Sequence, residues 1–126
     1  GGDSSQVQEQ LRNVQHIQPT ANGAFGAILE SGAVVTWGAR RYGGDSSRVQ
    51  EQLRNVQHVQ ATAGAFAAIL ESGAVVTWGD PEYGGDSSRV QEQLRNVQHV
   101  QATATAFAAT LESGAVVQVS LNLGLL

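Results

Sequence analysis

The sequence predicts an all-β fold of three tandem repeats that form propeller-like blades in an incomplete ring. The first observation is the repeat itself, because Gly-Gly-Asp-Ser-Ser begins at Gly1, Gly43 and Gly84, a spacing of about 41 residues. The second is a pair of β-favouring runs around a Ser-Gly step in each copy. The third is that the copies, residues 1–42, 43–83 and 84–126, occupy the whole chain as a single repeat domain.

The second half of each repeat predicts a β-hairpin and a third strand. In the middle copy, residues 66–70 and 75–78 are β-favouring runs, and residues 71–74 between them contain Ser-Gly. Glycine allows the positive φ that a tight turn requires, so we expect the two runs to pair. The run 56–62 just upstream is expected to add the third strand.

The first half of each repeat has two interpretations. Val49, Leu53 and Val56 have the spacing of one helix face, and Ser47 lies three residues before Gln50, as in a capping box. The stretch 49–53 also alternates apolar and polar residues, as a half-buried outer strand does. The sequence therefore leaves one short helix per repeat and a fourth, outer strand both open.

The third repeat departs from the other two at its end. Residues 118–125 alternate apolar and polar side chains, which predicts a strand. An uncovered apolar strand promotes aggregation, so we expect this one to lie against something. We interpret it as a candidate interface strand with four residues on one face: Val119, Leu121, Leu123 and Leu125.

The stretch 68–79, Ala-Ile-Leu-Glu-Ser-Gly-Ala-Val-Val-Thr-Trp-Gly, resembles the repeat of the regulator-of-chromosome-condensation family. In that family a strand ending in Ala-Leu leads to a Gly turn, a Val-x-x-Trp-Gly strand and a Gly-rich loop. The stretch 49–63 looks like the part of such repeats that leads into the innermost strand. The resemblance covers all three copies and implies four-stranded blades around a central axis.

Three blades are too few for a propeller, which closes with about 4–8. We therefore expect a fragment of a longer protein, or a chain that assembles with copies of itself or with other proteins. The chain begins with Gly1 and contains no methionine, which favours a processed or truncated product, and no targeting segment is recognisable. The alternative is a β-trefoil-like barrel, which three four-stranded repeats close without a partner.

The composition excludes several kinds of chemistry. The chain has no cysteine, so disulfides, thiolate metal sites and cysteine nucleophiles are excluded. Its basic residues number 7 against 11 acidic ones, which disfavours a nucleic-acid groove. No apolar run approaches the roughly 20 residues of a membrane-spanning helix, so we expect a soluble chain without membrane insertion. No motif indicates a cofactor, and a small-molecule ligand is not expected.

Three sets of equivalent residues could carry chemistry, and each also has a structural interpretation. Three histidines would bind a metal only if the repeats brought them together: His16, His58 and His99. The aspartates of the Gly-Gly-Asp-Ser-Ser motif are better explained by Asx-turns than by cation or sugar binding: Asp3, Asp45 and Asp86. Trp37 and Trp78 are expected to pack between blades. No arrangement of side chains indicates a catalytic site.

The loop between repeats varies most from copy to copy. The first loop carries two positive charges where the second carries two negative ones, and such loops commonly carry recognition. The candidate partner surface therefore comprises Arg40, Arg41, Tyr42, Asp80, Glu82 and Tyr83. We interpret the chain as a non-enzymatic β-repeat scaffold for protein–protein interaction. The alternatives are a guanine-nucleotide exchange module for a small GTPase, which the family resemblance implies, and a lectin-like trefoil that binds carbohydrate.

Overall fold

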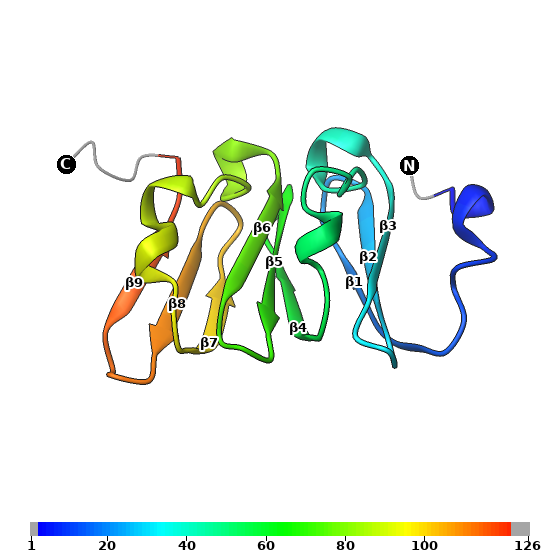
Figure 1. Cartoon of the computed structure of the whole chain (residues 1–126). Helices are drawn as coiled ribbons and strands as arrows, with labels where there is room; N and C mark the ends of the chain where they lie inside the picture. The colour runs from blue at the N-terminus through cyan, green and yellow to red at the C-terminus, as the bar shows by residue number, and fades with distance from the viewer. Residues whose placement is uncertain (1–2, 122–126) are drawn as a thin grey trace.

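The computed structural model describes residues 3–121 and is all-β in these residues, which confirms the predicted fold class. Each repeat folds into one antiparallel three-stranded sheet, which we call a blade (Figure 1). The first blade holds β1 (Val14–Pro19), β2 (Ala24–Leu29) and β3 (Val34–Gly38). The second holds β4 (Val56–Ala61), β5 (Ala65–Leu70) and β6 (Val75–Gly79). The third holds β7 (Val97–Ala102), β8 (Phe107–Leu111) and β9 (Val116–Val119).

The blades lie side by side in a row, with the first and third at opposite ends (Figure 1). Among the strand contacts between blades, β1 lies against β4 and β4 lies against β7, so the first strands of the repeats approach one another. This arrangement is propeller-like, with three blades that form no closed ring in residues 3–121. The trefoil-like barrel is wrong, because every strand in residues 3–121 pairs only within its own repeat and no barrel closes.

The core lies between the blades because side chains alternate across each middle strand. In β5, Phe66 and Ala68 point toward the first blade, whereas Ala65, Ala67 and Ile69 point toward the third. Both faces of the second blade are therefore buried, and its five successive residues from Ala65 to Ile69 are at most 4% exposed. A strand buried on both faces is apolar throughout, which explains the continuous Ala-Phe-Ala-Ala-Ile-Leu run.

The ambiguous first half of each repeat forms short 3-10 turns, so the fourth, outer strand is wrong. These turns are η1 (Ser5–Val7), η3 (Gln50–Gln52) and η5 (Ser88–Gln93). Leu53 and Leu94 follow η3 and η5 and are each 1% exposed, because they pack on the face of the preceding blade. The Gln50 side-chain amide donates to the carbonyl of Val34 at 3.1 Å, which ties this turn to the preceding blade.

Backbone hydrogen bonds join the hairpin turn of one blade to the first strand of the next. The amide of Val56 donates to the carbonyl of Gly32 at 3.0 Å, and the amide of Val97 donates to that of Gly73 at 2.9 Å. Asn55 precedes Val56 with a φ of 54°, a left-handed conformation that asparagine adopts more readily than most residues. A register shift that indicates a β-bulge follows in every first strand: between Val14 and His16 in β1, and at the equivalent places in β4 and β7.

The long strand expected at the end of the third repeat is wrong in its extent. Strand β9 ends at Val119, and Leu121 lies in a turn with 52% of its surface exposed. Val119 is 2% exposed and packs in the core between the second and third blades, so it is not part of a free interface strand. Leu123 and Leu125 lie outside the described residues. Within residues 3–121 there is no helix of the length and hydropathy needed to cross a membrane.

Candidate functional site

The predicted partner surface consists of two adjacent loops, each built on a 3-10 turn. These turns are η2 (Arg40–Tyr42) and η4 (Pro81–Tyr83), and each ends at a glycine with a left-handed backbone, Gly43 at φ 110° and Gly84 at φ 94°. At the start of η4, Asp80 Oδ1 accepts a hydrogen bond from the amide of Glu82 at 2.9 Å. Pro81 occupies the first turn, where its missing N–H costs nothing.

The opposite charges of the two loops bond to each other. Arg41 Nε donates to Asp80 Oδ2 at 2.8 Å, and this contact raises the pKa of the Arg41 guanidinium. Tyr42 and Tyr83 pack edge to face with their ring centroids 6.1 Å apart. Asp80 is only 2% exposed, so it is an internal link between repeats and not part of an accessible surface.

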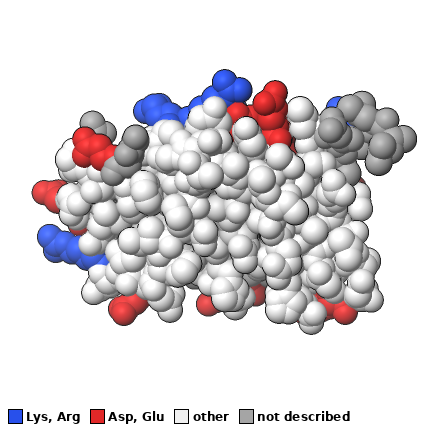
Figure 2. Space-filling model, turned by 180° about the vertical axis from the view of Figure 1, so that it is seen from behind, with Lys and Arg blue, Asp and Glu red and all other residues white. Residues whose placement is uncertain are grey.

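The loops leave a charged groove of about 490 Å³ beside Arg40, Arg41 and Arg48. The groove also has acidic walls, because Asp45 and Asp86 line it and Arg40 pairs with Asp45 at 3.0 Å. Figure 2 shows basic and acidic side chains side by side along this edge of the molecule. Because opposite charges lie next to each other in the groove, it favours neither an anionic nor a cationic ligand. The groove therefore does not indicate which class of ligand it would bind.

The aspartates of the Gly-Gly-Asp-Ser-Ser motif form the Asx-turns that the sequence predicts. Oδ1 of Asp3, Asp45 and Asp86 accepts a hydrogen bond from the backbone amide two residues later, at 2.9, 3.0 and 2.9 Å. These hydrogen bonds stabilise the charged carboxylates, so the pKa of each lies below its ordinary value. The aspartates are therefore parts of the turns between repeats.

The histidines stand at equivalent, exposed positions of the three first strands: His16, His58 and His99. In the part of the chain that the structure describes, no group of three or more side chains could hold a metal ion. The repeats therefore place these histidines in a row along the blades without bringing them together into a cluster.

The faces of the blades provide a second candidate surface. We call the face toward the preceding repeat the leading face and the other one the trailing face. In the second blade the leading face is buried against the first, with Val59 5%, Phe66 0% and Trp78 4% exposed. Trp78 stacks on Phe66 at 5.2 Å, and its Nε1 donates to the carbonyl of Gly43 at 3.1 Å. The expected packing of a tryptophan between blades is confirmed for Trp78.

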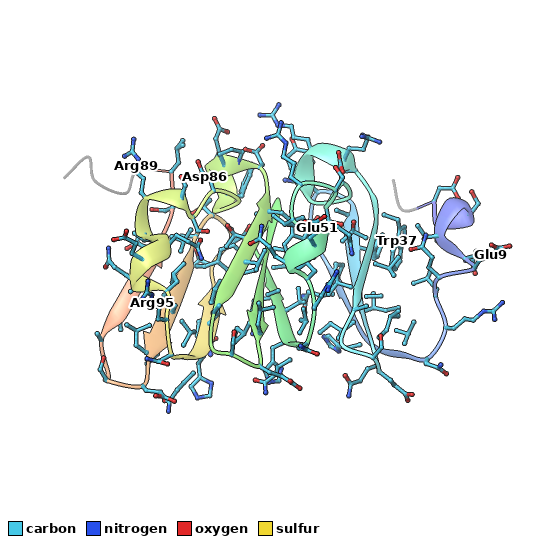
Figure 3. All side chains as sticks on the ribbon, viewed as in Figure 1. Glu9, Trp37, Glu51, Asp86, Arg89 and Arg95 are labelled. Carbon is cyan, nitrogen blue, oxygen red and sulfur yellow. The ribbon has the colours of Figure 1, made fainter. Side chains whose placement is uncertain are left out.

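The leading face of the first blade has similar residues without a blade to cover them. Ile17, which corresponds to Val59, is 49% exposed, and Val14, which corresponds to Val56, is 36% exposed. Phe25 and Trp37 stack at 5.4 Å as their counterparts do, but both are only partly buried. Figure 3 places Trp37 between β3 and the N-terminal segment that carries Glu9 and η1.

The trailing face of the third blade is exposed as well, and it is more polar. Val116 is 65% exposed, whereas its counterparts Val34 and Val75 are each 2% exposed. Thr110 stands where Ile69 stands in the second blade, and Gln118 replaces a threonine. No motif of the sequence singles out Val14, Ile17 or Val116. The available signal was the repeat itself, because a terminal copy exposes a face that inner copies bury.

Comparison with protein-family models gives no match to this chain, and comparison with curated proteins gives none either.

Proposed function

We propose that the chain is a non-enzymatic β-repeat scaffold that binds another protein through the leading face of its first blade. The observation that carries the proposal is the contrast between two equivalent faces. The leading face of the second blade is covered by a sheet, whereas that of the first keeps the same types of residue and leaves Ile17 49% exposed. Exposed apolar surface that matches a buried interface elsewhere in the same molecule is characteristic of an interaction site.

Two further features support the leading face over the loop surface. The loops use their most distinctive groups internally, because Arg41 bonds to the buried carboxylate of Asp80. The leading face instead has large apolar and aromatic side chains, the types that are enriched in the centres of protein interfaces. Val14 and Ile17 are exposed there, and Phe25 and Trp37 are partly buried. The partner is therefore expected to offer a complementary apolar sheet face.

The test is to supply a blade covalently. A copy of residues 43–83 placed ahead of Gly1 recreates the natural junction, because Gly-Gly-Asp-Ser-Ser follows Tyr83 in both cases. If the face accepts a blade, the amides of residues 14–18 in β1 will exchange with solvent at least about tenfold more slowly. The emission of Trp37 will also shift to shorter wavelength as its ring loses contact with water.

The matched control inserts the same copy between Tyr83 and Gly84, which gives a chain of identical composition with the original first blade still at its end. Hydrogen exchange of residues 14–18 should then stay at the rate of the unmodified chain. Equal exchange rates of these amides in the two four-repeat chains would refute the proposal, because the leading face would then gain nothing from a blade placed against it.

A further inference from the structure

Three of the large apolar side chains that the described residues leave exposed lie on the end faces of the row: Val14, Ile17 and Val116. Val14 and Ile17 lie on the leading face of the first blade, and Val116 lies on the trailing face of the third. Inside the molecule the equivalent side chains are 2–6% exposed. Neighbouring blades form the same kind of interface twice within the chain. The two ends of the row expose one side of that interface each, the leading face at one end and the trailing face at the other.

The internal interfaces show which groups meet. Val34 on a trailing face belongs to one core cluster with Leu53, Val56 and Val59 of the next repeat. The second interface repeats this pattern, with Val75 packed among Leu94, Val97 and Val100. By equivalence, Val116 would pack against Leu11, Val14 and Ile17 if the trailing face of the third blade met the leading face of the first.

Backbone groups at the two ends are complementary in the same way. Between blades, Val56 and Val97 donate their amides to the carbonyls of Gly32 and Gly73. A Cβ on Gly32 would lie 3.0 Å from Asn55 Cα, which shows how closely the next repeat approaches the turn. A Cβ on Gly114, the equivalent glycine of the third blade, would have nothing within 4 Å. Its turn is open to the amide of another Val14.

We propose that two copies of this chain associate head to tail, each placing the leading face of its first blade on the trailing face of the other's third blade. The pair then holds six blades, within the range of about 4–8 with which propellers close. A heterologous contact that closes on itself forms a ring with no free end. This inference rests on the proposed function and names its partner as a second copy.

The contact between copies is more polar than the contacts within one, because Thr110 and Gln118 replace Ile69 and Thr77. Neither replacement carries a charge, so each can be buried without an unpaired ion. The lost apolar area weakens the contact, and we expect association that is reversible and depends on concentration.

The experiment combines light scattering after size-exclusion chromatography with native mass spectrometry over a range of concentrations. The full chain should approach about twice its mass of 13.2 kDa and grow no further. Ile17→Glu and Val116→Glu each place a carboxylate on an end face, and each should weaken dimerisation more than about tenfold. Gln57→Glu adds the same charge to an exposed position of the middle blade and should leave dimerisation unchanged.

Mixing the two end-face variants decides the geometry. One interface of the mixed pair carries both glutamates, whereas the other joins the intact leading face of the Val116→Glu chain to the intact trailing face of the Ile17→Glu chain. A mixed dimer should therefore form where neither variant dimerises alone. Loss of association in Ile17→Glu but not in Val116→Glu would overturn the head-to-tail contact and indicate that two leading faces meet.

Other outcomes separate this inference from the function on which it rests. Growth of the full chain beyond a dimer would overturn ring closure. A chain that stays monomeric at every concentration would overturn the association of copies. In that case, slower exchange of residues 14–18 in the chain with an added blade would still support the proposed function, and unchanged exchange would refute both.

Discussion

Truncating Leu53 to alanine tests the stacking of blades most directly, because the chain contains its own controls. Leu11, Leu53 and Leu94 stand at the same position of the three repeats. Leu53 and Leu94 are each 1% exposed because the face of the preceding blade covers them, whereas Leu11 has no preceding blade and is only partly buried. The same substitution is thus placed in two different surroundings within one molecule.

The expected magnitude follows from these burials. Replacing a fully buried leucine with alanine lowers the free energy of unfolding by 2–5 kcal/mol in proteins generally, so we expect about 3 kcal/mol for Leu53→Ala and Leu94→Ala. Leu11→Ala loses a contact that is already partly open to water, and we expect about 1 kcal/mol. Small proteins have a total stability of about 5–15 kcal/mol, so the inner substitutions remove a large share of it.

The assay is urea unfolding followed by circular dichroism, at a concentration where the chain is monomeric. With a slope of about 1.5 kcal/mol per molar urea, the midpoint should fall by about 2 M for the inner leucines and by less than about 1 M for Leu11. Equal shifts at all three positions would refute the reasoning, because the preceding blade would then contribute nothing to the burial of Leu53 and Leu94.

Three further predictions concern the turns and the loops. Gly84→Ala should destabilise the protein by about 2 kcal/mol or more, and Gly114→Ala by only about 1 kcal/mol. Both glycines have a positive φ, but only a Cβ at position 84 would meet a phenylalanine ring, at 2.8 Å. Arg41→Ala should lower the urea midpoint because it removes the charged partner of the buried Asp80 carboxylate, whereas Arg40→Ala, from an exposed pair, should leave the midpoint almost unchanged. The pKa of Asp86 in the folded protein lies below its ordinary value of 3.8, so the carboxylate stabilises the fold at pH values above 3.8. This stabilisation is lost as the pH falls through the lowered pKa. Asp86→Asn should therefore flatten the decline in urea midpoint between about pH 5 and pH 2.

Each of these predictions has a result that contradicts it. Equal losses for the two glycine variants would mean that the packing around position 84 relaxes freely. An Arg40→Ala loss as large as that of Arg41→Ala would show that the link between repeats adds nothing beyond a surface ion pair. An unchanged acid profile for Asp86→Asn would show that the charge of the Asp86 carboxylate contributes no stability.

The strands were the most predictable part of the fold, because their signals are local. The middle copy was expected to pair residues 66–70 with 75–78, and the structure pairs Ala65–Leu70 with Val75–Gly79. The third strand was expected at 56–62 and spans Val56–Ala61. The first half of the repeat was not predictable, because the 3-10 turns at its start depend on burying Leu53 and Leu94 against a neighbouring blade.

The surface was less predictable, because it depends on how the repeats meet. The charge difference between the two loops suggested recognition of a partner, yet Arg41 and Asp80 bond to each other across the repeats. Thr105 in the third copy stands where the second copy has Gly64, so the turn itself does not require a glycine. The structure shows why Gly64 is small, because a Cβ there would lie 2.7 Å from the ring of Tyr83 and 2.8 Å from that of Tyr42.

The bulge that interrupts β1, β4 and β7 at the same place has a consequence for solubility at high concentration. These strands form one edge of each sheet, and an unbroken, flat edge could recruit strands from other molecules into fibrils. A bulge bends the strand and leaves its extra residue unpaired, so the row of backbone donors and acceptors loses its even spacing. The edge formed by these first strands is thereby a poorer template for amyloid-like growth than an unbroken strand would be.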